Sequence, residues 1–180
     1  MNKIPSLNLQ DFVSGNSAKQ QQFIVDLGRA FEEIGFVAIS GHYLNEALID
    51  ELYTQIKAFF DLPEDIKKKY EIEGLGGQRG YTSFGKEHAK GKKEADLKEF
   101  WHFGQYAEVP EILKPHYPPN VMVEELPAFN EVGENVFKAL EKTAMALLRA
   151  ISLHLGLDQH YFDGFVASGN SILRPIHYPP

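Results

Sequence analysis

The chain has 180 residues, enough for one domain with a real core, and its 43% hydrophobic and 24% charged residues are typical of a globular protein. A formal net charge of −7 argues against a nucleic-acid partner, which requires a basic face, and gives no sign of membrane-surface binding. The absence of cysteine excludes disulfides, thiolate nucleophiles and cysteine-ligated metals. No apolar run approaches the roughly 18 residues of a membrane span, and no secretory signal is visible, so we expect a cytoplasmic protein.

The N-terminal part of the chain predicts two strands and three helices. Residues 4–9 alternate apolar and polar side chains, which favours a short strand. A helix should follow, because apolar residues then recur at steps of three and four up to Ile34. Residues 36–40 are apolar and partly β-branched, and we expect them to form a buried strand. A second helix is expected after Asn45, and a short third one over residues 64–70.

A change of composition marks residues 73–98, which are rich in glycine and charged side chains and poor in aliphatic ones. Two interpretations are open, a solvated loop or a lid over a functional site, since long glycine-rich connections often have the second role. Within this stretch, residues 80–84 can form a short strand. Aromatic alternation over residues 99–104 predicts another strand.

The C-terminal part predicts one long helix and then a strand. Pro127 fits the first turn of the helix and Gly156 ends it, so at about 1.5 Å per residue the helix is roughly 40 Å long. Gly133 inside it costs about 1 kcal/mol relative to alanine, so we expect a close packing contact there. Residues 171–178 follow a Gly-Asn turn signal and end before a double proline, which favours a strand.

Motifs that would reveal the chemistry are absent. The sequence contains no phosphate-binding glycine loop and no serine nucleophile elbow. Mononuclear iron sites of oxidation enzymes use two histidines and one carboxylate, and on a strand a His-x-Asp/Glu pair would place two ligands on one face. None of the seven histidines has Asp or Glu two residues later. The sequence therefore predicts no metal site within these residues.

Six short segments nevertheless occur in the order known from one enzyme family. They are Ile4-Pro5-Ser6-Leu7-Asn8-Leu9, Gly35-Phe36-Val37-Ala38-Ile39-Ser40-Gly41-His42, Phe59-Phe60-Asp61-Leu62-Pro63-Glu64-Asp65-Ile66-Lys67, Arg79-Gly80-Tyr81 followed by Asp96-Leu97-Lys98-Glu99-Phe100, and Leu173-Arg174-Pro175-Ile176-His177-Tyr178-Pro179-Pro180. Together they resemble the N-terminal part of the isopenicillin N synthase-like family of 2-oxoglutarate- and iron(II)-dependent oxygenases. The resemblance covers nearly the whole chain and points to a bacterial branch.

The resemblance implies an α+β fold, with a helical N-terminal region, an incomplete double-stranded β-helix (jelly roll) and a long bracing helix. It implies one structural domain, with an N-terminal oxygenase region 1–120 that contains a substrate loop 73–98, and the long helix and first jelly-roll strand in 121–180. The implied cofactors are Fe(II) and 2-oxoglutarate, although the branch includes relatives that use no 2-oxoglutarate. The family's iron ligands, a His-x-Asp pair and a later histidine, would follow Pro180, so this chain alone is expected to be inactive.

Three residues take binding roles from the resemblance. Arg79 matches an arginine that grips a substrate carboxylate in penicillin-forming relatives, and Tyr81 on the same loop would form a substrate wall as an exposed aromatic. Tyr178 matches a strand tyrosine that reaches the carboxylate of 2-oxoglutarate or of the substrate. The alternatives are a solvated Arg79 and a Tyr178 packed at the strand end. Alternation along the strand places His177 opposite Tyr178, and Arg174 on the face of Tyr178 with a structural ion pair as its role.

Other ionisable residues of the aromatic strand receive structural interpretations. His102, next to Trp101, is expected to be a packed strand histidine and not a ligand. Glu99 and Asp96 are interpreted as hydrogen-bonding groups at a loop end and not as a catalytic acid pair.

The resemblance thus implies that the full-length form oxidises a small organic substrate by hydroxylation, desaturation or ring closure. The alternative is a non-catalytic binding or assembly module. In that case the open edge of the incomplete sheet would pair with a partner or with a second copy.

Overall fold

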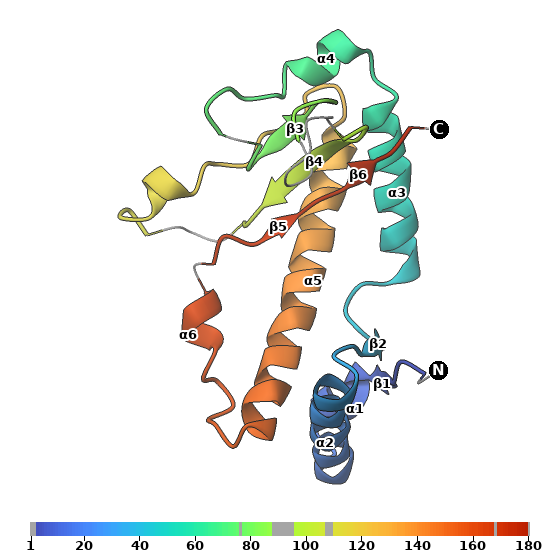
Figure 1. Ribbon diagram of the computed structural model, residues 1–180, viewed down its shortest axis with the longest axis vertical. Helices are drawn as coiled ribbons and strands as arrows, with labels where there is room; N and C mark the ends of the chain where they lie inside the picture. The colour runs from blue at the N-terminus through green and yellow to red at the C-terminus, as the bar shows by residue number, and fades with distance from the viewer. Residues whose placement is uncertain (1–2, 76, 88–95, 107–109, 168, 180) are drawn as a thin grey trace. The chain divides into compact units, whose positions relative to one another are not determined.

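A computed structural model describes residues 3–75, 77–87, 96–106, 110–167 and 169–179 (Figure 1). The backbone groups into two compact units, which we call the first unit (Met1–Asn45 and Ala139–Ala167) and the second unit (Glu46–Lys138 and Ser168–Pro180). The predicted division into regions 1–120 and 121–180 stays a prediction. No helix in the described ranges is long and apolar enough to cross a membrane.

The first unit combines short strands with helices. It contains β1 (Ser6–Asn8), α1 (Leu9–Val13), α2 (Ser17–Glu33), β2 (Ala38–Ser40), residues 139–154 of α5 (Pro127–His154) and α6 (Asp163–Val166). Side-chain caps start the first two helices, because Asn8 accepts a hydrogen bond from the Gln10 N–H at 3.0 Å and Asn16 accepts one from the Lys19 N–H at 3.1 Å. The core of this unit consists of buried side chains from α1, α2 and α5: Leu9, Phe12, Phe23, Ile24, Leu27, Ala146 and Ala150.

The two N-terminal strands are shorter than the sequence suggests. They pair in parallel, with Leu7 opposite Ile39, and no third strand joins them among the described residues. The predictions of a strand within residues 4–9 and of a strand within residues 36–40 are confirmed, but the expected burial of the second strand is wrong, since Ala38 and Ser40 are exposed and Phe36 is 68% exposed. Only one face of this two-stranded sheet packs against the core. Side chains alternate along a strand, so Ile39 packs against the core while its neighbours point away from it and stay exposed.

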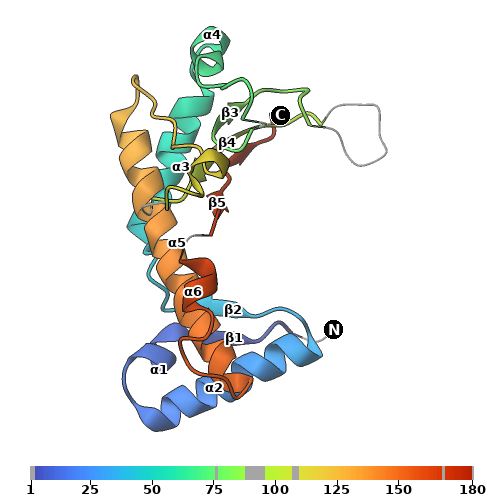
Figure 2. The ribbon, with the colours of Figure 1, turned by 90° about the vertical axis from the view of Figure 1, so that its left-hand side faces the viewer.

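The second unit is built around a four-stranded antiparallel sheet. It contains α3 (Glu46–Phe60), α4 (Glu64–Lys68), β3 (Gly80–Thr82), β4 (Glu99–Gly104), the 3-10 turn η1 (Lys114–His116), residues 127–138 of α5, β5 (Ile172–Leu173) and β6 (Ile176–His177). Strand β4 is central, with β3 on one side and β5 and β6 on the other. Helices α3 and α5 lie along one face of this sheet (Figures 1 and 2). A mainly aromatic core lies between these helices and the sheet: Phe59, Phe60, Tyr70, Tyr81, Trp101, Phe103, Val123, Phe129 and Phe137.

Several sequence predictions for this unit are confirmed. Strand β4 covers residues 99–104 as expected, and the long helix of 28 residues runs from Pro127 to His154. The close contact at Gly133 is present, because a Cβ atom there would lie 2.3 Å from the ring of Phe103. The mixture of helices and sheets confirms the α+β class, without a closed barrel in the described part of the chain.

The predicted loop 73–98 is described only in part, because residues 76 and 88–95 lie outside the described residues. The expected strand inside it is confirmed over Gly80–Thr82. At the base of the loop, the Asp96 N–H donates to the Glu87 carbonyl at 2.9 Å. The lid function of the loop stays a prediction.

Candidate functional site

The sheet of the second unit has two faces, which we call the core face and the open face. On the core face, Trp101 and Phe103 pack against Phe129 of α5, with ring centroids 5.2 and 5.0 Å apart. Because side chains alternate along a strand, Phe100 and His102 of β4 point to the open face. Their rings lie next to each other there, with centroids 4.9 Å apart.

The terminal segment 172–178 continues this alternation. Leu173 packs against the aromatic core, Pro175 is buried, and His177 stacks on Phe60 of α3 with centroids 5.2 Å apart. Residues of the other parity form an exposed row on the open face: Ile172 (40% exposed), Arg174 (37% for its side chain), Ile176 (42%) and Tyr178 (65%). The structure confirms that His177 lies opposite Tyr178 and that Arg174 shares the face of Tyr178.

Glu99 on the core face is a buried carboxylate bound by three side chains. Its Oε2 accepts hydrogen bonds from Lys67 Nζ at 2.8 Å and from the Tyr81 hydroxyl, and its Oε1 lies 2.8 Å from His177 Nδ1. Burial would raise the pKa of Glu99, but the hydrogen bonds from these three partners outweigh burial and lower it. The carboxylate therefore stays ionised and links α4, β3 and β6 to β4.

Arg174 on the open face is held by two aromatic side chains. Its Nε donates a hydrogen bond to His102 Nε2, and its guanidinium carbon lies 4.4 Å from the centroid of the Phe100 ring. Its Nη1 lies 3.6 Å from Glu87 Oε1, which confirms the predicted ion pair.

His102 is a packed strand histidine, as predicted, with 4% of its surface exposed. Its Nδ1 donates to the Gly77 carbonyl, and its Nε2 accepts the hydrogen bond from Arg174. Burial, followed by the charge of Arg174, lowers the pKa of His102 to about 4. The ring is therefore neutral at pH 7, with its proton on Nδ1.

Arg79 also belongs to the open face, since its guanidinium lies over Gly104 at the end of β4. A Cβ atom at Gly104 would come within 1.8 Å of Arg79 Nε, so only glycine leaves room for this side chain. Arg79 donates to the Gln78 carbonyl and to Asn170 Oδ1, both at 2.7 Å. Its Nε has no hydrogen-bond partner, and the side chain forms no ion pair, among the described residues. The expectation of a solvated Arg79 is wrong, because the side chain is 1% exposed, and this burial lowers the pKa of its guanidinium.

The expectation that Tyr81 is an exposed aromatic is also wrong. Tyr81 is opposite Trp101 in the β3–β4 register and shares its face, where it is 1% exposed and packs against Phe59 with centroids 5.8 Å apart. Burial, and then the hydrogen bond to Glu99, raises the pKa of its hydroxyl. The binding roles of Arg79, Tyr81 and Tyr178 stay predictions.

A metal site is not formed by the residues that the structure describes, because no group of three or more His, Asp or Glu there could hold an ion. The sheet does contain one His–carboxylate pair, Glu99–His177, but its carboxylate is already bound by Lys67 and Tyr81. The described side chains therefore do not form an iron centre by themselves.

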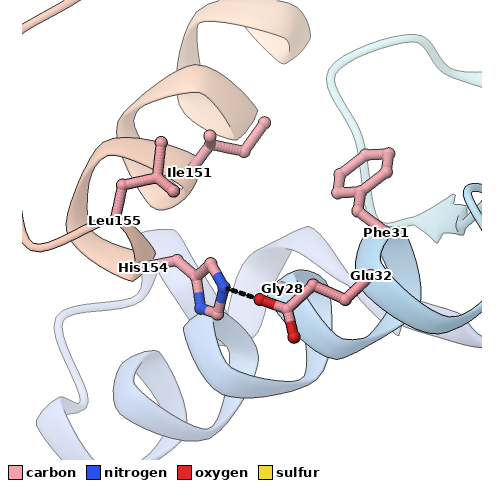
Figure 3. A pocket seen from close by; sticks show the side chains of 6 residues that line it. All are labelled: Gly28, Phe31, Glu32, Ile151, His154 and Leu155. Atoms are coloured by element: carbon pink, nitrogen blue, oxygen red, sulfur yellow. Dashed lines mark hydrogen bonds and ion pairs between the residues drawn. The ribbon is translucent and has the colours of Figure 1, made fainter.

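A shallow pocket in the first unit lies between α2 and the end of α5 (Figure 3). Gly28, Phe31, Ile151 and Leu155 give it an apolar lining, and one polar pair lies at its side, in which His154 Nε2 is 3.0 Å from Glu32 Oε1. It lacks the converging polar groups of the open face, so we regard the open face as the candidate functional site.

Comparison with known proteins agrees with the resemblance described above. The family model described as "non-haem dioxygenase in morphine synthesis N-terminal" matches residues 4–125. The 2-oxoglutarate-dependent dioxygenase frbA of a Dothideomycetidae species is 30% identical over 188 residues, which cover 98% of this chain and 54% of that protein. The chain thus spans about half the length of the curated relatives it matches.

Solved structures show the same fold. A protein of Caulobacter crescentus assigned to the 2OG-Fe(II) oxygenase family matches with a TM-score of 0.85 and 36% identity, over 100% of this chain and 57% of that one. A full-length Neurospora crassa protein in complex with alpha-ketoglutarate (2-oxoglutarate) matches with a TM-score of 0.80 and 25% identity, over 99% of this chain and 56% of that one. The chain therefore belongs to the non-haem dioxygenase N-terminal family, and its relatives include 2-oxoglutarate- and Fe(II)-dependent dioxygenases.

Proposed function

We propose that the complete protein containing this chain is an Fe(II)- and 2-oxoglutarate-dependent oxygenase that hydroxylates, desaturates or cyclises a small organic substrate. Family membership supports the reaction class, and the Neurospora crassa relative binds the co-substrate. Iron and 2-oxoglutarate supply the oxidising chemistry when bound. We propose that the iron ligands lie outside the described residues, which is supported by the lack of a metal-binding group within them.

The observation that carries this proposal is the open face itself. A sheet with one face packed on helices carries, on its other face, the exposed side chains of Arg174 and Tyr178 from segment 172–178, with the buried His102 of β4 beneath Arg174 and the buried Arg79 over the end of β4. We propose that this sheet is the first part of a double-stranded β-helix and that its open face is one wall of the substrate pocket. The helices on the core face brace this wall.

Individual residues contribute differently to such a wall. Tyr178 is exposed at the end of the row, where its hydroxyl can donate to a carboxylate of 2-oxoglutarate. Arg79 keeps an unused Nε–H donor at the other end, which supports a role in substrate binding. Tyr81 lies on the core face, so we assign it an indirect contribution to substrate binding, through the Glu99 carboxylate that also holds His177.

The test is titration of the complete gene product with Fe(II) and 2-oxoglutarate under anaerobic conditions, followed by measurement of succinate after oxygen is admitted. We expect both ligands to bind and succinate to form in proportion to bound iron. The 180-residue chain serves as the control and should bind neither ligand tightly. A complete product that binds no iron, or that forms no succinate, would overturn the proposal.

A binding or assembly module remains the second candidate, because the outer edge of β5 and β6 has no strand partner within the described ranges. An unpaired edge can add a strand from another chain. Sedimentation of the 180-residue chain at micromolar concentration distinguishes the two: a dimer that dissociates when proline replaces Ile172 favours edge pairing, and a monomer excludes pairing between copies.

A further inference from the structure

We propose that Glu99 and His177 are positioning residues for Tyr178. The hydrogen bond between their side chains on the core face holds the end of β6, and it thereby sets the direction in which Tyr178 projects from the open face. The inference rests on the function proposed above, in which Tyr178 meets 2-oxoglutarate, and it names the residues on which the strength of that contact depends.

The backbone alone holds the end of the terminal segment weakly. Strand β6 has two residues, and His177 is the last of them to pair with β4. Pro175 before the strand and Pro179 after it have no N–H group to donate to a neighbouring strand. Tyr178 therefore lies just beyond the last paired residue of a short ladder.

Tyr178 has no side-chain anchor of its own. Its surface is 65% exposed, and among the described residues no hydrogen bond or ring contact to it is found. The placement of its hydroxyl therefore depends on the backbone that carries it, and that backbone is attached through the preceding residue, His177.

His177 is held in two directions. Its Nδ1–H donates to Glu99 Oε1 at 2.8 Å, since an ionised carboxylate can only accept. Its ring also stacks on the ring of Phe60, with centroids 5.2 Å apart and planes inclined by 27°. The hydrogen bond acts within the plane of the imidazole and the stacking acts across it, so together they fix the orientation of the ring.

Glu99 is a firm support because both of its oxygens are engaged. Its Oε2 accepts from Lys67 Nζ at 2.8 Å and from the Tyr81 hydroxyl, and the residue is 1% exposed. Lys67 Nζ also donates to the carbonyl of Phe60 at 3.0 Å, the residue on which His177 stacks. Four residues from α3, α4, β4 and β6 thus form a closed ring of contacts, and none of them can move without breaking one.

The alternation of the extended chain passes this order on to Tyr178. Successive side chains of a strand point to opposite faces and are about 3.3 Å apart along it. With His177 fixed on the core face, the Cα–Cβ bond of Tyr178 is directed to the open face. A phenol that is already ordered loses less conformational freedom when a ligand binds, so we expect the ring of contacts to strengthen ligand binding without touching the ligand.

The test compares His177→Asn with His177→Leu in the complete gene product. The two new side chains are nearly equal in size and both lose the stacking on Phe60, but only the amide can donate to Glu99 from the place of Nδ1. We expect His177→Leu to weaken anaerobic binding of 2-oxoglutarate about fivefold, and His177→Asn by less than about twofold, measured by calorimetry. Equal losses in the two variants would overturn the proposal.

A double-mutant cycle separates positioning from general stabilisation. Tyr178→Phe should weaken 2-oxoglutarate binding about tenfold, because it removes the hydroxyl donor. In the Tyr178→Phe background, His177→Leu should cause no further loss, since it acts through that hydroxyl. The same loss in both backgrounds would show a structural role only and would refute the proposal. His154→Leu, which breaks a histidine–glutamate contact of 3.0 Å in the first unit, is the matched control and should leave binding unchanged.

Fluorine NMR gives a readout that needs no ligand. A meta-fluorotyrosine placed at Tyr178 of the metal-free complete protein should give one narrow signal in the wild type and in His177→Asn, and a shifted or broadened signal in His177→Leu. If His177→Leu does not fold, Tyr81→Phe takes its place, because it removes one donor to Glu99 and keeps the ring in the core. A fluorine signal that is unchanged in the variant that folds would contradict the positioning role.

The two readouts also distinguish this inference from the function on which it rests. If the wild type does not bind 2-oxoglutarate while the fluorine signal depends on His177, the oxygenase function is wrong and the positioning of Tyr178 stands. If 2-oxoglutarate binds but the effect of His177→Leu does not depend on Tyr178, the positioning role alone is wrong.

Discussion

The ammonium group of Lys67 and the carboxylate of Glu99 form an ion pair of 2.8 Å in which both side chains are buried, with 9% and 1% of their surfaces exposed. Lys67 Nζ also donates to the Phe60 carbonyl at 3.0 Å. Because the two charges lie in a low-dielectric core, each depends on the other, and loss of one leaves the other unpaired.

Replacing Glu99 with glutamine is therefore expected to destabilise the protein by about 3–5 kcal/mol. The loss can be measured by urea unfolding followed by the fluorescence of Trp101, the single tryptophan, which is fully buried. Glu64→Gln is the matched control, because it removes an exposed pair with Lys68 and should change stability little. Equal losses in the two variants would contradict a special role of the buried pair.

Substitution of Gly133 by alanine should destabilise the protein although alanine favours helix. The new Cβ would lie 2.3 Å from the fully packed Phe103 ring. Overpacking of this kind costs about 1–3 kcal/mol, and the gain in helix propensity offsets about 1 kcal/mol of it. Thermal unfolding checks the sign. Gly164→Ala serves as the control, since nothing lies within 4 Å of its Cβ position, and it should be neutral or stabilising.

His102 should make stability fall at acidic pH. Its pKa in the folded state, about 4, lies below its ordinary value of 6.5, so folding favours the neutral ring. The resulting stabilisation is complete above pH 6.5 and is lost as the pH falls towards 4, with a total of about 3 kcal/mol. Urea unfolding at a series of pH values should show a steeper loss for the wild type than for His102→Gln. Parallel pH profiles of the unfolding free energy in the two proteins would show that His102 does not contribute to the loss of stability at acidic pH.

Placing a methyl group at Gly104 should displace Arg79. The Cβ atom would lie 1.8 Å from the guanidinium Nε, so the side chain must leave its position over β4. We expect a stability loss of about 1–3 kcal/mol and faster modification of Arg79 by phenylglyoxal, read by mass spectrometry. Arg29, which is 58% exposed in its side chain, should react at the same rate in both proteins. If phenylglyoxal modifies Arg79 no faster in Gly104→Ala than in the wild type, the close approach of Arg79 to Gly104 is contradicted.

The sequence predicted the elements of the second unit better than its site. Aromatic alternation over residues 99–104 identified β4 and its two faces, and parity placed His177 and Tyr178 on opposite sides. The burial of Glu99 was missed because its partner Lys67 is 32 residues away, and charge pairing over such distances leaves no local pattern. A signal was nevertheless present, since Glu99 shares the parity of the buried Trp101.

The exposure of Arg79 and Tyr81 was misjudged for a related reason. Their glycine-rich surroundings are typical of a surface loop, yet Gly104, 25 residues later, supplies the space that Arg79 fills. Local composition cannot reveal a cavity made by a distant glycine. Local composition also misled the prediction for β2. Its apolar run predicted a buried strand, but β2 pairs with a single neighbouring strand in a two-stranded sheet.

The alternation of residues 172–178 separates two tasks within one short peptide. Leu173, Pro175 and His177 secure its attachment, so Ile172, Ile176 and Tyr178 form a set whose chemistry can be varied while the scaffold is left intact. A combinatorial library at these three codons would therefore retune ligand preference with little penalty in folding yield, which makes the segment a natural starting point for directed evolution.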